Sequence, residues 1–175
     1  MESFIPSNRL QLKLSVVPFI IFPISPCEEI ISWTEDHKTS ENIRKRGAFT
    51  LSIADIPHME AADFFGIATA NKMADKFERS GLTAVKSGKV DAPVVQEFPL
   101  TLECRVVEDK MEVYGHHVIG EIVGILADEA VLDEKGKVDP TKLNAFVFDQ
   151  FQNGYYAIGE KVGQAWQSGV PFMKK

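Results

Sequence analysis

Two apolar segments of alternating pattern lie within LTLECRVVEDKMEVYGHHVIGEIVGI, residues 100–125. Alternation of apolar and polar residues is typical of a strand with one buried face, so strands are expected over Leu100–Val107 and Val113–Ile125. The polar pair Asp109-Lys110 between them is the expected turn. The stretch therefore predicts an antiparallel pair of strands.

Shorter elements lie on both sides of this pair. Further strands are expected over residues 10–16 and 48–53, which alternate in the same way, and over the short apolar run 146–148. Helices are expected to begin near Thr39 or Ser40 and to cover Met59–Ala70, Asp75–Ser80 and Tyr156–Trp166. Mostly β elements with short peripheral helices predict a mainly β fold with a closed or partly closed barrel, because closure removes the edges of a small sheet.

Length, charge and cysteine content limit the classes of function. A chain of 175 residues with 45% hydrophobic content is expected to form one domain, residues 1–175. The net charge of −6 argues against nucleic acid, because phosphate backbones require clustered Lys and Arg. The apolar stretch Val16–Ile24 is too short to span a bilayer, so no membrane partner is expected. Cys27 and Cys104 are too few for a disulfide scaffold, and a cytoplasmic location is expected.

The segment HKTSENI, residues 37–43, concentrates polar donors where a helix is expected to begin. The free backbone amides and the dipole at a helix N-terminus favour an anion. Lys38 adds a positive charge, Thr39 and Ser40 add hydroxyl donors, and Asn42 adds an amide. This chemistry suits one phosphate monoester. The alternative is a capped, solvated helix start, which is commoner for such a run.

The segment GHHVIGEI, residues 115–122, carries adjacent histidines on the second expected strand. Neighbouring side chains on a strand point to opposite faces, so only one of His116 and His117 is expected to face a ligand. Two side chains on opposite faces make a poor chelate, and no metal site is expected. The alternative is a histidine at the surface or in an interface.

Five segments recur together in one order: HKTSENI (37–43), ADFFGIATANKMADKFERSGLT (62–83), DAPVVQEFPLTLEC (91–104), GHHVIGEI (115–122) and FDQFQNGYYAIGE (148–160). In this order the chain resembles the flavin reductase-like family, the FMN-binding split barrels that include flavoredoxin. The resemblance runs from about His37 to the end of the chain. It implies an antiparallel Greek-key split β-barrel, FMN as cofactor, and a homodimer with the flavin near the subunit interface.

The resemblance also implies roles for particular residues. The HKTSENI region contacts the phosphate tail of FMN, with Thr39 the position that matches best. A lysine faces the isoalloxazine, where a cation stabilises the negative charge that hydride addition places on the ring. The alignment leaves Lys72 and Lys76 both open, with Lys72 favoured, and the alternative is an exposed basic loop. A histidine upstream of the Gly-Glu-Ile run, His116 or His117, lies near the flavin.

Aromatic residues gather in the last of the five segments. Phe148 and Tyr155 belong to this cluster, and an aromatic plane there could stack on the flavin, whereas core packing is the commoner use of such residues. Gln150 stands where the family carries a proline, so the turn is expected to differ.

Residues 1–30 do not show the family pattern of an apolar strand, a glycine-containing turn, an Asn and a small-residue segment with a Trp. The first 46 residues contain no glycine and four prolines. One wall of the flavin site is therefore expected to be altered.

The expected function is that of an NAD(P)H:flavin oxidoreductase or a flavoredoxin-like electron-transfer protein, with free flavin or a redox partner protein as electron acceptor. The chain has no Gly-x-Gly-x-x-Gly fingerprint after a strand, so NADH or NADPH would bind only transiently, over the flavin. Two alternatives remain open: a non-catalytic flavin-binding electron carrier, and a dimeric relic that has lost flavin binding through its altered N-terminus. No catalytic residue is assigned from the sequence.

Overall fold

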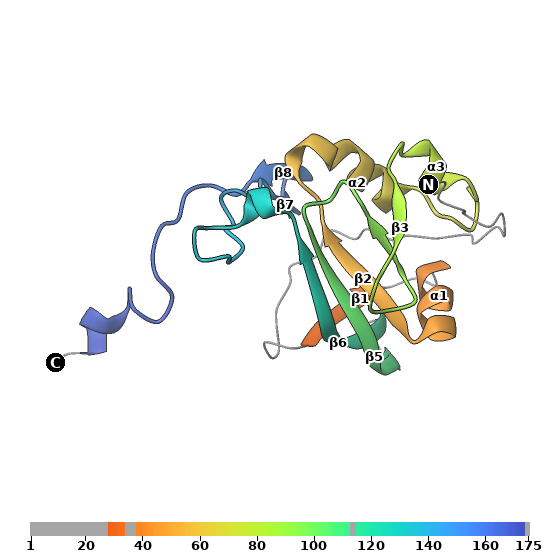
Figure 1. The fold of residues 1–175 in the computed structure, drawn as a ribbon, viewed down its shortest axis with the longest axis horizontal. Coiled ribbons are helices and arrows are strands. Elements are labelled where there is room, and N and C mark those ends of the chain that lie inside the picture. The colour runs from red at the N-terminus through yellow and green to blue at the C-terminus, as the bar shows by residue number, and fades with distance from the viewer. Residues whose placement is uncertain (1–27, 34–37, 113–114, 174–175) are drawn as a thin grey trace, which may run out of the picture.

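A four-stranded antiparallel sheet lies at the centre of the molecule, with its strands in the order β1-β6-β5-β2 (Figure 1). The structure is a computed structural model, and it describes residues 28–33, 38–112 and 115–173. The strands of this sheet are β1 (Glu28–Trp33), β2 (Ala48–Ile53), β5 (Leu100–Glu112) and β6 (Gly115–Ala127). The strand predicted over residues 10–16 lies outside the described residues, as does most of the segment expected to differ from the family.

The β5–β6 pair confirms the antiparallel strands predicted from the alternating pattern. Its ladder runs from the Leu100–Ala127 pair to the Glu112–Gly115 pair, with register shifts after Glu103 and after Val106. The turn predicted at Asp109-Lys110 is wrong, because both residues lie within β5. Their side chains find charged partners there: Lys110 pairs with Glu108 at 2.6 Å, and Asp109 pairs with His116. A polar pair in this chain thus marks an ion-paired part of the ladder rather than its end.

Short helices connect and cover the strands. They are α1 (Lys38–Arg46), the 3₁₀ turn η1 (Ile56–His58), α2 (Met59–Ile67) and α3 (Lys76–Arg79). The helix start predicted near Thr39 agrees with α1. Helix α2 is shorter than its predicted range because Ala68 takes an extended conformation, with φ −92° and ψ 132°. Helix α3 is followed by Gly81 at φ +72°, a conformation that glycine adopts without strain.

Two small hairpins complete the strand set, β3 (Ala84–Lys86) with β4 (Pro93–Val95), and β7 (Phe146–Asp149) with β8 (Gly154–Ala157). The 3₁₀ turns η2 (Glu129–Val131) and η3 (Val170–Met173) lie before β7 and near the C-terminus. The helix predicted over Tyr156–Trp166 is wrong. Tyr156 pairs with Val147 in the β7–β8 ladder, and Gly159 and Gly163 interrupt the segment that follows.

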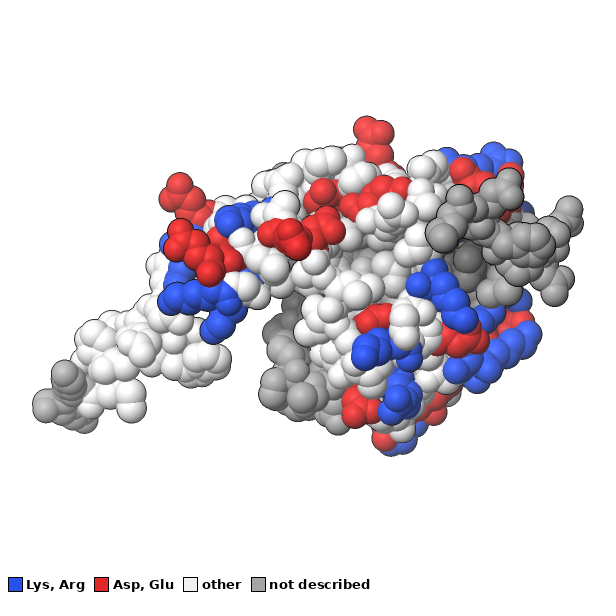
Figure 2. Space-filling model, viewed as in Figure 1, with Lys and Arg blue, Asp and Glu red and all other residues white. Residues whose placement is uncertain are grey.

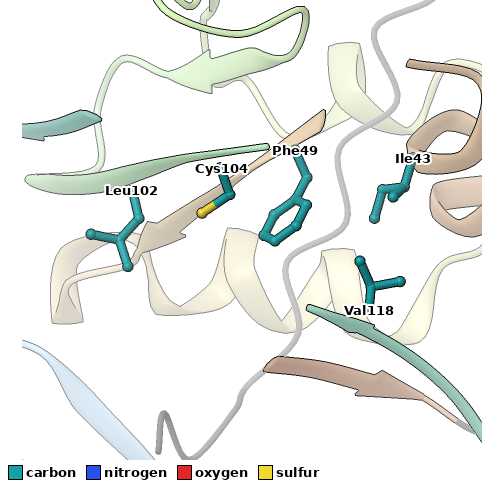
Figure 3. Packing of buried hydrophobic residues seen from close by; sticks show 5 residues of the cluster. All are labelled: Ile43, Phe49, Leu102, Cys104 and Val118. Atoms are coloured by element: carbon teal, nitrogen blue, oxygen red, sulfur yellow. The ribbon is translucent and has the colours of Figure 1, made fainter. Parts of the chain in front are cut away.

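The buried side chains form three groups. One lies between α1 and the sheet and contains Ile43, Phe49, Leu102, Cys104 and Val118, which Figure 3 shows converging from α1, β2, β5 and β6. A second lies under α2, and a third packs Val131 of η2 against Leu143 and Ala145, which precede β7. Burying each large apolar side chain contributes about 1.5–3 kcal/mol, so these groups fix α1 and α2 against the strands. No helix among the described residues is both long and apolar enough to span a membrane.

Candidate functional site

The first turn of α1 carries the polar residues that the sequence marks as phosphate ligands. Ser40 is buried, whereas Lys38, Thr39 and Asn42 are half-buried. The ammonium of Lys38 pairs with Glu41, which also accepts a bond of 2.6 Å from Lys45. Hydrogen bonds from Lys38 and then Lys45 lower the pKa of the Glu41 carboxyl to about 2. An anion at this helix start would therefore share the Lys38 charge with Glu41.

The two candidate lysines have different surroundings. Lys72 is exposed in the loop after α2, and its amide donates to the Thr69 carbonyl at 3.1 Å. Lys76 is buried: its Nζ donates to the carbonyl oxygens of Phe65 at 2.7 Å and Ala68 at 2.6 Å. The same Nζ lies 5.4 Å from the centre of the Phe65 ring. Burial lowers the pKa of the Lys76 ammonium.

Lys76 therefore closes the C-terminal end of α2. The last carbonyls of a helix have no partner within the helix, and a cation there bonds them and opposes the helix dipole. Lys76 achieves this from α3, so it also holds α3 against α2. Lys72 has the more accessible side chain of the two.

The two histidines lie differently on β6, as the alternation of a strand predicts. His117 is half-buried, whereas His116 is buried on the same face as Val118. Asp109 accepts a hydrogen bond from Nε2 of His116, and Arg44 Nη2 lies 3.4 Å from the same nitrogen. Arg44 Nε also lies 3.5 Å from Asp109 Oδ2. His116 thus belongs to a charged group that ties α1 to the β5–β6 pair.

The aromatic residues of the β7–β8 hairpin form a cluster against α2. The Tyr155 ring lies 5.2 Å from Phe146 and 5.6 Å from Phe148, measured between ring centres. The Tyr155 hydroxyl donates to Asp63 Oδ1 at 2.7 Å, and this bond raises the pKa of the phenol to about 12. Tyr155 therefore fastens the hairpin to α2, while Phe148 stays exposed.

Eight of the ten candidate residues fall into two groups, and Lys72 and His117 belong to neither. Lys38, Thr39, Ser40 and Asn42 lie on α1, and His116 joins them through Arg44. Lys76 contacts α2 through Phe65, and Tyr155 contacts it through Asp63. The Phe148 ring packs beside Tyr155. Among the described residues, no cluster of three or more His, Cys, Asp or Glu side chains is suited to a metal ion.

A buried carboxylate was not found by sequence reasoning. Glu103 of β5 is only 1% exposed, and its Oε1 accepts from Ser87 Oγ at 2.5 Å and from the Lys89 amide at 3.3 Å. Gly124 lies against its other oxygen. Alternation places Glu103 on the polar face of the strand, but the segment that connects β3 to β4 covers that face. The signal for this contact is a non-local one, so the pattern of β5 alone does not contain it.

Residues 19–150 match the sequence model of the flavin reductase like domain. The chain belongs to this family. The matched range includes residues 19–30 of the segment expected to differ, and it ends before β8. Membership supports a flavin as cofactor, and it accords with the first turn of α1, whose amides and hydroxyl suit a phosphate.

Solved structures confirm the split-barrel fold of this flavin reductase like domain. Flavoredoxin of Desulfovibrio vulgaris (Miyazaki F) is 34% identical, with a TM-score of 0.75 over 81% of this chain and 75% of that one. Flavoredoxin from Methanosarcina acetivorans is 24% identical, with a TM-score of 0.79 over 88% and 81%, and shares the fold. An uncharacterized protein of Archaeoglobus fulgidus is 28% identical over 122 residues, 68% of each chain. The mainly β fold predicted from the sequence is therefore confirmed.

Proposed function

We propose that this chain binds FMN through the first turn of α1 and transfers electrons through the flavin. The observation that carries the proposal is a hydroxyl-rich helix start, Lys38 to Asn42, in a member of the flavin reductase like family. FMN when bound supplies the hydride and electron chemistry, and the protein supplies position and charge. The activity is that of an NAD(P)H:flavin oxidoreductase or of a flavoredoxin-like electron-transfer protein.

The residues of the chain divide the work of holding FMN. The backbone amides of the first turn and the Thr39 hydroxyl bind the phosphate. Lys38, which pairs with Glu41 in this structure, adds positive charge. Of the two lysines, Lys72 serves the ring, because the Lys76 ammonium already bonds two carbonyl oxygens. Of the two histidines, His117 serves the ring, because His116 already bonds Asp109.

The proposal extends to partners that the family resemblance implies. Two copies form a homodimer with the flavin near their interface. NADH or NADPH binds transiently over the flavin, and the acceptor is free flavin or a redox partner protein in the cytoplasm. A net charge of −6 fits these partners better than a nucleic acid.

The colour and reduction of the purified protein test this function. We expect a yellow protein whose flavin absorbance is bleached by NADH or NADPH in the absence of air. Bleaching by dithionite but by neither nicotinamide would assign the chain as an electron carrier without reductase activity. A colourless protein that takes up no added FMN would overturn the proposal. The remaining alternative would then be a dimeric relic that has lost flavin binding.

A Thr39→Ala substitution tests the phosphate site. Loss of one hydrogen bond to a charged phosphate is expected to weaken FMN binding by about 1–2 kcal/mol. Riboflavin has no phosphate, so its affinity should be unchanged. Flavin fluorescence titration of the apo-protein measures both ligands. Thr83→Ala, which removes an exposed hydroxyl beyond α3, is the matched control. Equal losses for FMN and riboflavin would contradict the assignment.

A further inference from the structure

The chain ends in an arm, residues 158–173, that stands away from the rest of the molecule (Figure 1). We call it the C-terminal arm. Every residue from Tyr156 to Met173 is exposed, although many of the side chains are large and apolar. Trp166 is 95% exposed, Phe172 is 91% exposed, and Val162 is fully exposed. The arm also lies beyond residue 150, where the match to the family model ends.

The C-terminal arm has a defined internal structure. The amide of Gln164 donates to Ser168 Oγ, and that hydroxyl donates back to the Gln164 carbonyl, each at 2.9 Å. The amides of Gln167 and Ser168 also donate to the Gln164 carbonyl. These bonds close a turn that holds Trp166 at φ 58°, in the left-handed region that residues other than glycine rarely adopt. The turn therefore leaves the Trp166 side chain 95% exposed.

Such an arm is not stable by itself. Fixing the backbone of each residue costs about 1–2 kcal/mol of conformational entropy, and burial of apolar surface normally offsets this cost. Among the described residues, a bond from the Ile158 amide to the Ala145 carbonyl at 3.2 Å holds the base of the arm to the body. The rings of Trp166 and Phe172 therefore bury almost no surface against the described residues. A second surface must supply that burial.

We propose that two copies of this chain exchange their C-terminal arms, each arm packing on the body of the other copy. The inference rests on the homodimer of the proposed function and names the element that holds it together. Exchange of identical arms about a two-fold axis gives a closed, self-complementary interface.

The low charge of the C-terminal arm and the exposed apolar side chains of the body both favour a second copy of this chain as the partner that covers the arm. The described arm carries one acidic and one basic residue, Glu160 and Lys161, and Figure 2 shows it almost without charge. It therefore fits an apolar surface, and the body exposes large apolar side chains on both faces of its longest strand pair. The large exposed apolar side chains there are Val107, Met111, Ile125 and Leu126.

The apolar area of two arms is also of the size that a stable dimer interface needs. An aromatic ring buries about 150–250 Å², so the two rings in each of two arms bury roughly 600–1,000 Å² before the receiving surface is counted. Stable interfaces bury about 1,200–2,000 Å² in total. The arm is irregular rather than a long amphipathic helix, the form that lies on membranes, so a lipid surface fits it less well.

Light scattering and fluorescence of the full-length chain test the exchange. We expect a mass near twice 19.5 kDa for the wild type. Trp166→Ser and Phe172→Ser are each expected to raise the dissociation constant of the dimer about thirtyfold or more, the effect of losing a central aromatic contact. Ile67→Ser, which removes an exposed apolar side chain from α2, is the matched control and should leave the mass unchanged. In a Trp33→Phe variant, Trp166 is the only tryptophan, so its emission should shift to shorter wavelength as the dimer forms.

The outcomes separate this inference from the proposed function. A dimer that is unaffected by both arm substitutions, with Trp166 emission typical of water, would overturn arm exchange and leave the dimer in place. A wild-type monomer at every concentration would overturn both the dimer and the exchange, while flavin binding is judged separately by colour. Binding of monomers to anionic phospholipid vesicles through Trp166 would also overturn the exchange.

Discussion

Gly120→Ala is expected to lower the free energy of unfolding by about 2–3 kcal/mol, the cost of forcing an extra methyl group into a packed core. A Cβ on this residue would lie 2.5 Å from Cζ and 2.6 Å from Cε1 of Phe49, and 3.0 Å from Cβ of Cys104. Phe49 cannot move aside easily, because it is itself buried between α1 and the sheet (Figure 3). The Gly-Glu-Ile run therefore needs a glycine for close packing, whatever the neighbouring histidines do.

Urea unfolding followed by circular dichroism measures this loss. Gly66→Ala is the matched control, because its new methyl group would meet no described atom within 4 Å apart from its chain neighbours and the backbone of its own helix, α2. Replacing glycine by alanine within a helix is expected to stabilise the protein by about 0.5–1 kcal/mol. The two substitutions add the same group and should have effects of opposite sign. A Gly120→Ala protein as stable as the wild type would mean that Phe49 does not pack over this position.

The local patterns of this chain specify the elements of its fold well. Alternation in residues 100–125 predicts both long strands, and residues 48–53 are β2 as expected. The opposite faces of His116 and His117 follow from the same period of two. These features depend only on neighbours in sequence, so a single sequence contains them.

The errors arise where a distant segment decides the outcome. The carboxylate of Glu103 is buried because the β3–β4 connection supplies Ser87, and nothing in the strand itself indicates it. Asp109 remains in a strand, where it lies opposite Val118 of β6 and accepts a hydrogen bond from His116, although the polar pair Asp109-Lys110 favours a turn. A helix is expected over Tyr156–Trp166, yet Tyr156 lies in β8 and the apolar residues that follow are exposed in the C-terminal arm.

The candidate site likewise combines features that neighbouring residues determine with features that distant segments determine. The helix start with Thr39 is a local signal, and the structure has α1 where that signal predicts it. The sequence near Lys72 and Lys76 does not decide which of them faces the flavin. The decision depends on which ammonium is already hydrogen-bonded to another part of the chain. The carbonyls of Phe65 and Ala68, which accept hydrogen bonds from Lys76 Nζ, lie eleven and eight residues earlier in the chain. Only the fold brings them to this nitrogen.

The two lysines are therefore expected to give opposite results when each is replaced by methionine. Lys76→Met keeps the length of the side chain but leaves the Phe65 and Ala68 carbonyls without their donor. Each buried carbonyl left unsatisfied costs about 1–3 kcal/mol, so we expect the free energy of unfolding to fall by about 3 kcal/mol in total. Lys72→Met removes an exposed ammonium and should change it by less than about 0.5 kcal/mol.

The reduction potential of bound flavin should respond in the reverse sense. A cation near the ring stabilises the negative charge of the reduced form, so its loss makes reduction harder. Lys72→Met should lower the reduction potential of bound FMN, whereas Lys76→Met should leave it unchanged at a temperature where both variants are folded. Redox titration with a reference dye, beside urea unfolding of the same samples, measures both quantities. A lowered potential in Lys76→Met alone would give the flavin role to Lys76, and its two carbonyl bonds would then have to break when FMN binds.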